Sequence, residues 1–151
     1  MKSSNLIKLF TLSFLFVSFF SCGKYEEGPS ISLLPKNSRL QQKWRPIQSV
    51  DGSNGTVTNI DNDGSYIEFK KGGTTQYYYH DIMSFIGVDA ATGTWAFSSD
   101  KTQLIHTTDA IQMAGITVWP TSETTYTIKK LKINSLGLES ENGDKTYYEY
   151  Y

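Results

Sequence analysis

Beyond about residue 40, hydrophobic and polar side chains alternate with a period of two over short stretches, a pattern typical of β-strands with one buried face. In one such stretch Ile67 and Phe69 share a face, and Glu68 between them lies on the other. No segment after Cys22 keeps an apolar repeat of about 3.6 residues, so we expect little helix. The pattern predicts strands at residues 40–50, 66–70, 74–80, 94–97, 103–108, 115–119, 124–131, 136–140 and 145–151.

Turn-forming residues separate these strands and indicate how the chain is arranged. Tyr126 and Ile128 share one face of their strand, whereas Leu131 falls on the other, so we expect a β-bulge near Lys129 and Lys130. Eight or nine short strands over about 110 residues predict a closed, antiparallel up-and-down β-barrel, with a β-sandwich as the alternative. Turn chemistry is strongest at residues 51–52, 61–64, 72–73 and 142–143.

The N-terminal segment follows a different pattern. Lys2 and Lys8 accompany an uncharged, mostly apolar run of about a dozen residues, which is too short for a bilayer span and typical of a signal peptide. The run ends at Ser21 and Cys22, and a small residue before the only cysteine resembles a bacterial lipobox. We therefore expect cleavage after Ser21 and acylation, by palmitate or similar chains, at Cys22. The alternative is that Cys22 is only a small apolar residue at the end of this segment.

Residues 22–39 predict a tether between the lipidated cysteine and the barrel, because Gly28, Pro29 and Pro35 interrupt both helix and strand. The predicted organisation is a signal peptide at 1–21, a lipidated Cys and tether at 22–39, and a barrel domain at 40–151. The sequence CGKYEE, which starts at Cys22, resembles surface-export signals of some Gram-negative lipoproteins. We expect an outer-membrane lipoprotein, displayed at the cell surface; an ordinary solvated linker and a periplasmic orientation are the alternative.

Composition and motifs exclude several kinds of function. The 151 residues include 14 basic and 15 acidic side chains, so the chain lacks the basic footprint of a nucleic-acid-binding protein. One cysteine excludes an internal disulfide and a cysteine-rich zinc site. Residues 59–64 match the start of a calcium loop, but Lys70 stands where the loop needs a bidentate Glu. With no nucleophile elbow, phosphate loop or dinucleotide fingerprint, we predict no catalytic residue, metal or cofactor.

Three segments together are similar to bacterial lipocalin-like lipoproteins: LQQKW at 40–44, GTWAFSSDK at 93–101 and YTIKKL at 126–131. The similarity covers most of the chain after Cys22, and the middle segment is its most specific part. It implies a lipocalin-like barrel in which Trp44, like the first-strand Trp of lipocalins, plugs the base and is mainly structural. Much of this family has no assigned substrate, so the resemblance implies a fold more than an activity.

Two classes of function fit such a barrel, because eight strands can either enclose one small ligand or be filled by side chains. In the first, the chain is a non-catalytic module that binds a small apolar ligand, and Trp95, Trp119, Tyr77 and Tyr79 are candidate wall residues. In the second, it is an accessory or protein-interaction lipoprotein whose filled barrel holds no ligand. The same aromatic residues would then pack in the core or along ordinary strands.

Overall fold

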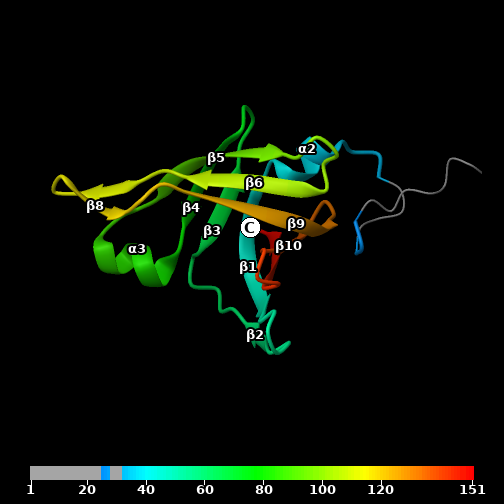
Figure 1. Ribbon diagram of the computed structural model, residues 1–151, viewed down its shortest axis with the longest axis horizontal. Helices are drawn as coiled ribbons and strands as arrows, with labels where there is room; N and C mark the ends of the chain where they lie inside the picture. The colour runs from blue at the N-terminus through cyan, green and yellow to red at the C-terminus, as the bar shows by residue number, and fades with distance from the viewer. Residues whose placement is uncertain (1–24, 28–31) are drawn as a thin grey trace, which may run out of the picture.

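The computed structural model describes residues 25–27 and 32–151, which form a mostly β structure (Figure 1). Eight antiparallel strands follow one another around a barrel, and the last pairs with both its predecessor and the first, so the sheet closes on itself. This confirms the expected closed barrel. Its strands are β1 (Lys43–Val50), β3 (Tyr66–Phe69), β4 (Thr74–Tyr78), β5 (Ala91–Phe97), β6 (Gln103–Thr108), β9 (Ser122–Leu131), β10 (Ser135–Glu139) and β11 (Lys145–Tyr150).

Closure depends on the pairing of β1 with β11, in which Trp44 lies opposite Tyr150. A β-bulge separates Pro46 from Gln48 in this register. Bulges are among the few places in a sheet where proline is tolerated, because it has no backbone N–H to donate. A ninth strand, β2 (Val57–Asn59), pairs with the second half of β1 outside the closed ring.

Because consecutive strands run in opposite directions, the connections alternate between two ends of the barrel. We call one end the mouth and the other the base. The mouth comprises residues 51–65, 79–90, 109–121 and 140–144. The base comprises residues 32–42, 70–73, 98–102 and 132–134. In Figure 1, the mouth elements α3 and β8 lie at the left and α2, at the base, lies towards the right.

Large side chains fill the base half of the barrel. Leu40, Trp44 and Leu131 are fully buried there, and the Trp44 Nε1–H donates a hydrogen bond of 2.9 Å to the Leu40 carbonyl. Leu138 lies opposite Ile128 while Gly137 lies opposite Lys130, so one residue of β9 is bulged out between them. The expected bulge is thereby confirmed, and it turns the side chains on both sides of it into the core.

Two short helices and one hairpin depart from the expected pattern. The first strand was expected from residue 40, but helix α2 (Lys36–Leu40) comes first and β1 starts at Lys43. The strand expected at 74–80 ends at Tyr78 and is followed by helix α3 (His80–Ile86), which Gly87 ends with a φ of 68°. The strand expected at 115–119 is β8 (Ile116–Trp119), and it pairs with β7 (Ile111–Met113) outside the barrel.

Residues 25–27, which fall within the predicted tether, contact the barrel; we call them the N-terminal clasp. The buried Tyr25 donates its hydroxyl to the Lys101 carbonyl at 2.8 Å, at the base. The backbone N–H of Glu27 donates to the Lys129 carbonyl at 2.8 Å, and its carboxylate pairs with Lys130 at 2.8 Å. The clasp is therefore held to the barrel by backbone carbonyls of the β5–β6 turn and β9 and by the Lys130 side chain of β9.

The predicted signal peptide and Cys22 lie outside the residues that the structure describes. Over the described ranges, 25–27 and 32–151, none of the helices has the length and apolar character that crossing a membrane requires.

Candidate functional site

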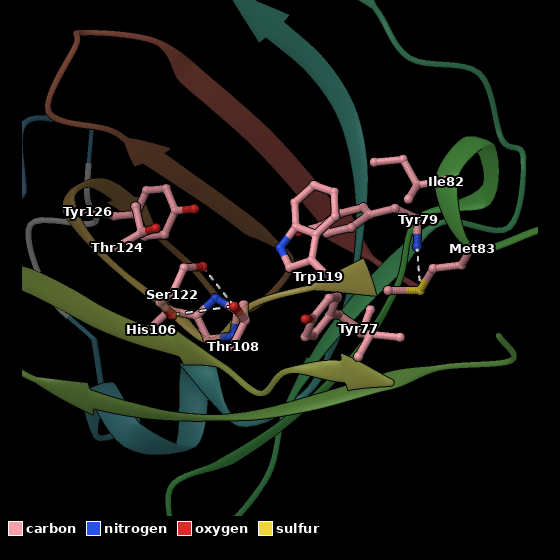
Figure 2. Close-up of a pocket in the computed structure, with 11 residues that line it drawn as sticks. Tyr77, Tyr79, Ile82, Met83, His106, Thr108, Trp119, Ser122, Thr124 and Tyr126 are labelled. Carbon is pink, nitrogen blue, oxygen red and sulfur yellow. Dashed lines mark hydrogen bonds between the residues drawn. The ribbon is translucent and has the colours of Figure 1, made fainter. Parts of the chain in front are cut away.

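An open cavity of about 180 Å³ lies at the mouth end of the barrel (Figure 2). Strands β4, β6 and β9 supply one part of its wall, and α3 with the β7–β8 hairpin supplies the rest. It is lined by Tyr77, Tyr79, Ile82, Met83, His106, Thr108, Ile111, Trp119, Ser122, Thr124 and Tyr126.

The apolar part of the wall combines buried and entrance residues. Tyr77 points inward from β4, and its ring centroid lies 5.5 Å from that of Tyr79. Met83 is buried and anchors α3, and its Sδ accepts a hydrogen bond from the Tyr79 backbone N–H at 3.4 Å. Ile82 and Trp119 remain partly exposed, about 42% and 43%, so both reach the entrance and the interior surface. The apolar surface thus continues from the cavity to the rim.

His106 is buried in the wall of the cavity, with 5% of its surface exposed. Its Nε2 lies 3.0 Å from Oγ1 of Thr75, and its ring makes edge contacts with Phe69 and Tyr77. Burial lowers the pKa of His106 below its usual 6.5. The imidazole is therefore neutral near pH 7 and can donate through one nitrogen and accept through the other.

Tyrosine hydroxyls supply further polar groups inside the barrel. Burial is the main cause that raises the pKa of Tyr79, Tyr126 and Tyr148. Tyr126 also raises the pKa of Tyr79, and both of these phenols raise the pKa of Tyr148. These phenols stay protonated over the physiological range and can donate hydrogen bonds. With His106 neutral, no side chain lining the cavity carries a formal charge. The arrangement suits a ligand with rings and an uncharged hydroxyl, carbonyl or amide group.

The structure brings together three of the four candidate ligand-binding residues. Tyr77, Tyr79 and Trp119 all line the cavity, whereas Trp95 does not. Trp95 is buried nearer the base, where its Nε1–H donates to the Lys70 carbonyl at 3.0 Å. Trp44, expected at the barrel base, is fully buried in that half of the barrel.

Sequence reasoning did not single out His106, Met83 or Ile82 as site residues. Alternation in β6 carries a usable signal for His106, because it shares the inward face with the fully buried Leu104. Ile82 and Met83 lie on α3, whose formation was not expected, so no pattern pointed to them.

The other motifs of the sequence do not form a metal site in the described part of the chain. No group of three or more His, Cys, Asp and Glu side chains converges there. In the segment that matches the start of a calcium loop, Asp63 accepts hydrogen bonds from the N–H and hydroxyl of Ser65 at 2.8 and 3.0 Å. These bonds are those of an Asx-type turn.

The sequence matches no protein-family model and no curated protein. The fold, however, matches solved structures. One is the crystal structure of a lipocalin-like protein from Bacteroides uniformis ATCC 8492, with a TM-score of 0.56 and 19% identity, covering 75% of this chain and 99% of that chain. Another is an uncharacterized protein from Bacteroides eggerthii DSM 20697, with a TM-score of 0.55 and 17% identity, covering 74% and 99%. The fold is therefore lipocalin-like.

Proposed function

We propose that this chain is a non-catalytic, lipid-anchored binding module that holds a small, uncharged, largely apolar molecule in the barrel mouth. The observation that carries the proposal is the cavity of about 180 Å³. Aromatic and aliphatic side chains line most of it, and a few neutral polar groups lie among them. A buried apolar cavity of about 150 Å³ can bind benzene. The cavity thus has room for one aromatic ring, and a longer molecule would extend over the rim at Ile82 and Trp119.

The charge around the mouth favours a neutral ligand over an anionic one. The four mouth connections contain eight Asp and Glu side chains and no Lys or Arg. Inside the cavity no cation is available to pair with a carboxylate or phosphate. Fatty acids and haem carboxylates would therefore meet a repulsive field on approach and find no counter-ion inside.

Isothermal titration with 4-ethylphenol, indole and 2-naphthol, beside octanoate and haem, tests this proposal. We expect saturable binding of neutral rings and much weaker binding of the anions. Trp119→Ala should weaken binding about tenfold by removing an aromatic contact, and Tyr126→Phe severalfold by removing one hydrogen bond. Tyr150→Phe makes the same chemical change at an exposed tyrosine outside the cavity and should bind like wild type.

Failure of every compound to bind would favour the second candidate function, an accessory protein that binds a protein partner. A specific observation supports that alternative: Phe85 on α3 is 90% exposed and Ile116 on β8 is 68% exposed, both at the mouth. Apolar side chains that gather at one end of a protein often mark an interaction surface.

The anchoring part of the proposal rests on the basic start, the short apolar run and Cys22 as the sole cysteine. Metabolic labelling with a palmitate analogue should tag the wild-type chain and leave Cys22→Ser unlabelled, whereas equal labelling of both would refute acylation at this residue. Protease treatment of intact cells tests outward display from the outer membrane. Digestion only after lysis would place the domain on the periplasmic side.

A further inference from the structure

Charge is distributed unequally between the two ends of the barrel. The base segments contain six basic and one acidic side chain, whereas the mouth connections contain eight acidic side chains and neither Lys nor Arg. The net charge of the whole chain is only −1. The charge difference therefore comes from where the basic and acidic side chains lie along the barrel, and not from an excess of one sign. A protein with such a distribution is oriented by a charged surface, with its base towards negative charge.

The base also exposes aliphatic side chains beside these cations. Leu33 is 98% exposed and Ile133 is 61% exposed, and with Leu34 they line a groove of about 380 Å³. Lys132 lies on the same groove. Exposed aliphatic side chains next to basic ones are typical of surfaces that enter the headgroup region of a bilayer. The mouth exposes apolar side chains too, but its connections carry eight acidic side chains and neither Lys nor Arg, so an anionic bilayer would repel that end.

A buried guanidinium at this groove has an unmet hydrogen-bonding group. Arg39 is 6% exposed and lines the groove, and its Nη1–H donates to the Leu131 carbonyl at 2.5 Å. Its Nε–H, however, has no hydrogen-bond partner in the described part of the chain. Buried donors usually find a partner, and a phosphate oxygen matches the guanidinium well. The Nε–H is itself buried, so a lipid phosphate would reach it only if the side chains of the groove moved apart on contact with a headgroup.

The N-terminal clasp leads to the same end of the barrel. Tyr25 is held at the base by the Lys101 carbonyl, and the Lys36 ammonium lies 4.4 Å from the centroid of its ring. Tyr25 lies three positions after Cys22 in the sequence, a chain length of at most about 10 Å. An acyl anchor at Cys22 would thus hold the base, and not the mouth, next to the bilayer.

We infer that the base of the barrel is a docking surface for an anionic lipid bilayer, with Leu33, Leu34 and Ile133 in the headgroup region and surrounding lysines on the phosphates. The inference rests on the proposed lipid anchoring for its location, while the charge and the exposed side chains support it independently. The mouth then opens away from the bilayer, with α3 and β8 at the far end (Figure 1).

Hydrogen exchange of the full chain on phosphatidylcholine vesicles, with and without phosphatidylglycerol, tests this docking. We expect backbone amides of residues 32–34 and 132–134 to exchange more slowly on the anionic vesicles, and those of 79–90 to exchange equally on both. A base variant carrying Lys71→Gln, Lys101→Gln and Lys132→Gln should lose this slowing. Each lysine near an anionic surface strengthens binding about fivefold, so the three together contribute roughly a hundredfold.

A mouth variant carrying Asp61→Asn, Asp81→Asn and Asp89→Asn is the matched control, because it changes three exposed charges at the other end and should keep the slowing at the base. Equal exchange of the base on both kinds of vesicle would overturn the inference. Slowing at the mouth, or full slowing in the base variant, would overturn it as well. A missing acyl anchor would give a different result. In flotation at low salt, the chain would then not bind neutral vesicles but would still bind anionic ones through its base.

Discussion

At the base of the barrel Leu40, Trp44 and Leu131 are fully buried and pack the interior, whereas at the mouth Tyr77 and Trp119 border an open cavity. Both ends are built on the same eight strands, so strand pairing does not account for the difference. What differs is the covering: at the base, α2 places the fully buried Leu40 against Trp44, whereas at the mouth α3 and the β7–β8 hairpin border an open cavity. The packed core and the candidate binding cavity therefore lie at different depths along the barrel axis.

Removing the base end of β11 should have the largest effect. Deletion of residues 147–151 takes away the partners of Trp44 and Pro46 and exposes strand edges on β1 and β10. We expect the truncated chain to unfold or aggregate, measured by circular dichroism and light scattering. Shortening the β7–β8 hairpin at Ala114 and Gly115 should leave the barrel folded, because that hairpin pairs only with itself. A truncated chain that melts like wild type would contradict the importance of closure.

Removing one indole at each end compares the two regions with a single substitution. Trp44→Ala leaves a cavity in a fully buried site and should lower the free energy of unfolding by about 3–5 kcal/mol. Trp119→Ala, at a partly exposed site outside the barrel, should lower it by less than about 1 kcal/mol while weakening ligand binding. Urea denaturation measures both. Equal losses would show that the mouth hairpin is part of the stabilising core.

The pH dependence of stability sharpens the description of the cavity. Because burial lowers the pKa of His106 in the folded chain, the unfolded chain binds a proton more readily below its pKa of 6.5. The contribution of His106 to the free energy of unfolding is therefore fully present above about pH 6.5. It falls towards pH 5, because the unfolded chain then binds a proton that the folded chain does not. Denaturant midpoints should show this slope in wild type and lose it in His106→Gln. His80→Gln, at an exposed position on α3, should keep it.

A small and local effect is expected at the N-terminal clasp. Tyr25→Phe removes the hydrogen bond to the Lys101 carbonyl but keeps the buried ring, so the free energy of unfolding should fall by about 1 kcal/mol. Limited proteolysis should then cut near the clasp faster in the variant, with no change at the mouth. Identical cleavage rates would mean that the hydroxyl does not hold the clasp to the base.

Alternation of side chains predicted the barrel and the bulge beside Lys129. It does so because every second residue of a strand faces the interior. The alternation does not show, however, how far along the barrel axis an inward-facing side chain lies. Trp95 and Tyr77 both face inward, yet β5 runs towards the base and carries Trp95 away from the cavity. The candidate residues therefore differ in depth: Tyr77 lines the cavity at the mouth, whereas Trp95 lies nearer the base.

The elements that border the mouth could not be predicted from local pattern. In α3, Met83 is buried while Phe85 is exposed, so the apolar residues of this segment do not mark a single buried face. The clasp is unpredictable for another reason: Tyr25 meets a residue 76 positions away in the chain, a contact that depends on the finished barrel. Long-range packing, rather than local propensity, sets both features.

Fluorine NMR of the chain labelled with 5-fluorotryptophan tests most directly whether the mouth, and not the base, binds a ligand. The three indoles report on different depths: Trp119 at the cavity, Trp95 below it and Trp44 at the base, and single Trp→Phe variants assign their resonances. On titration with 2-naphthol we expect a saturable shift of the Trp119 resonance that far exceeds any shift of Trp44. A saturable shift of Trp44 without one of Trp119, or no shift at any indole, would contradict binding at the mouth.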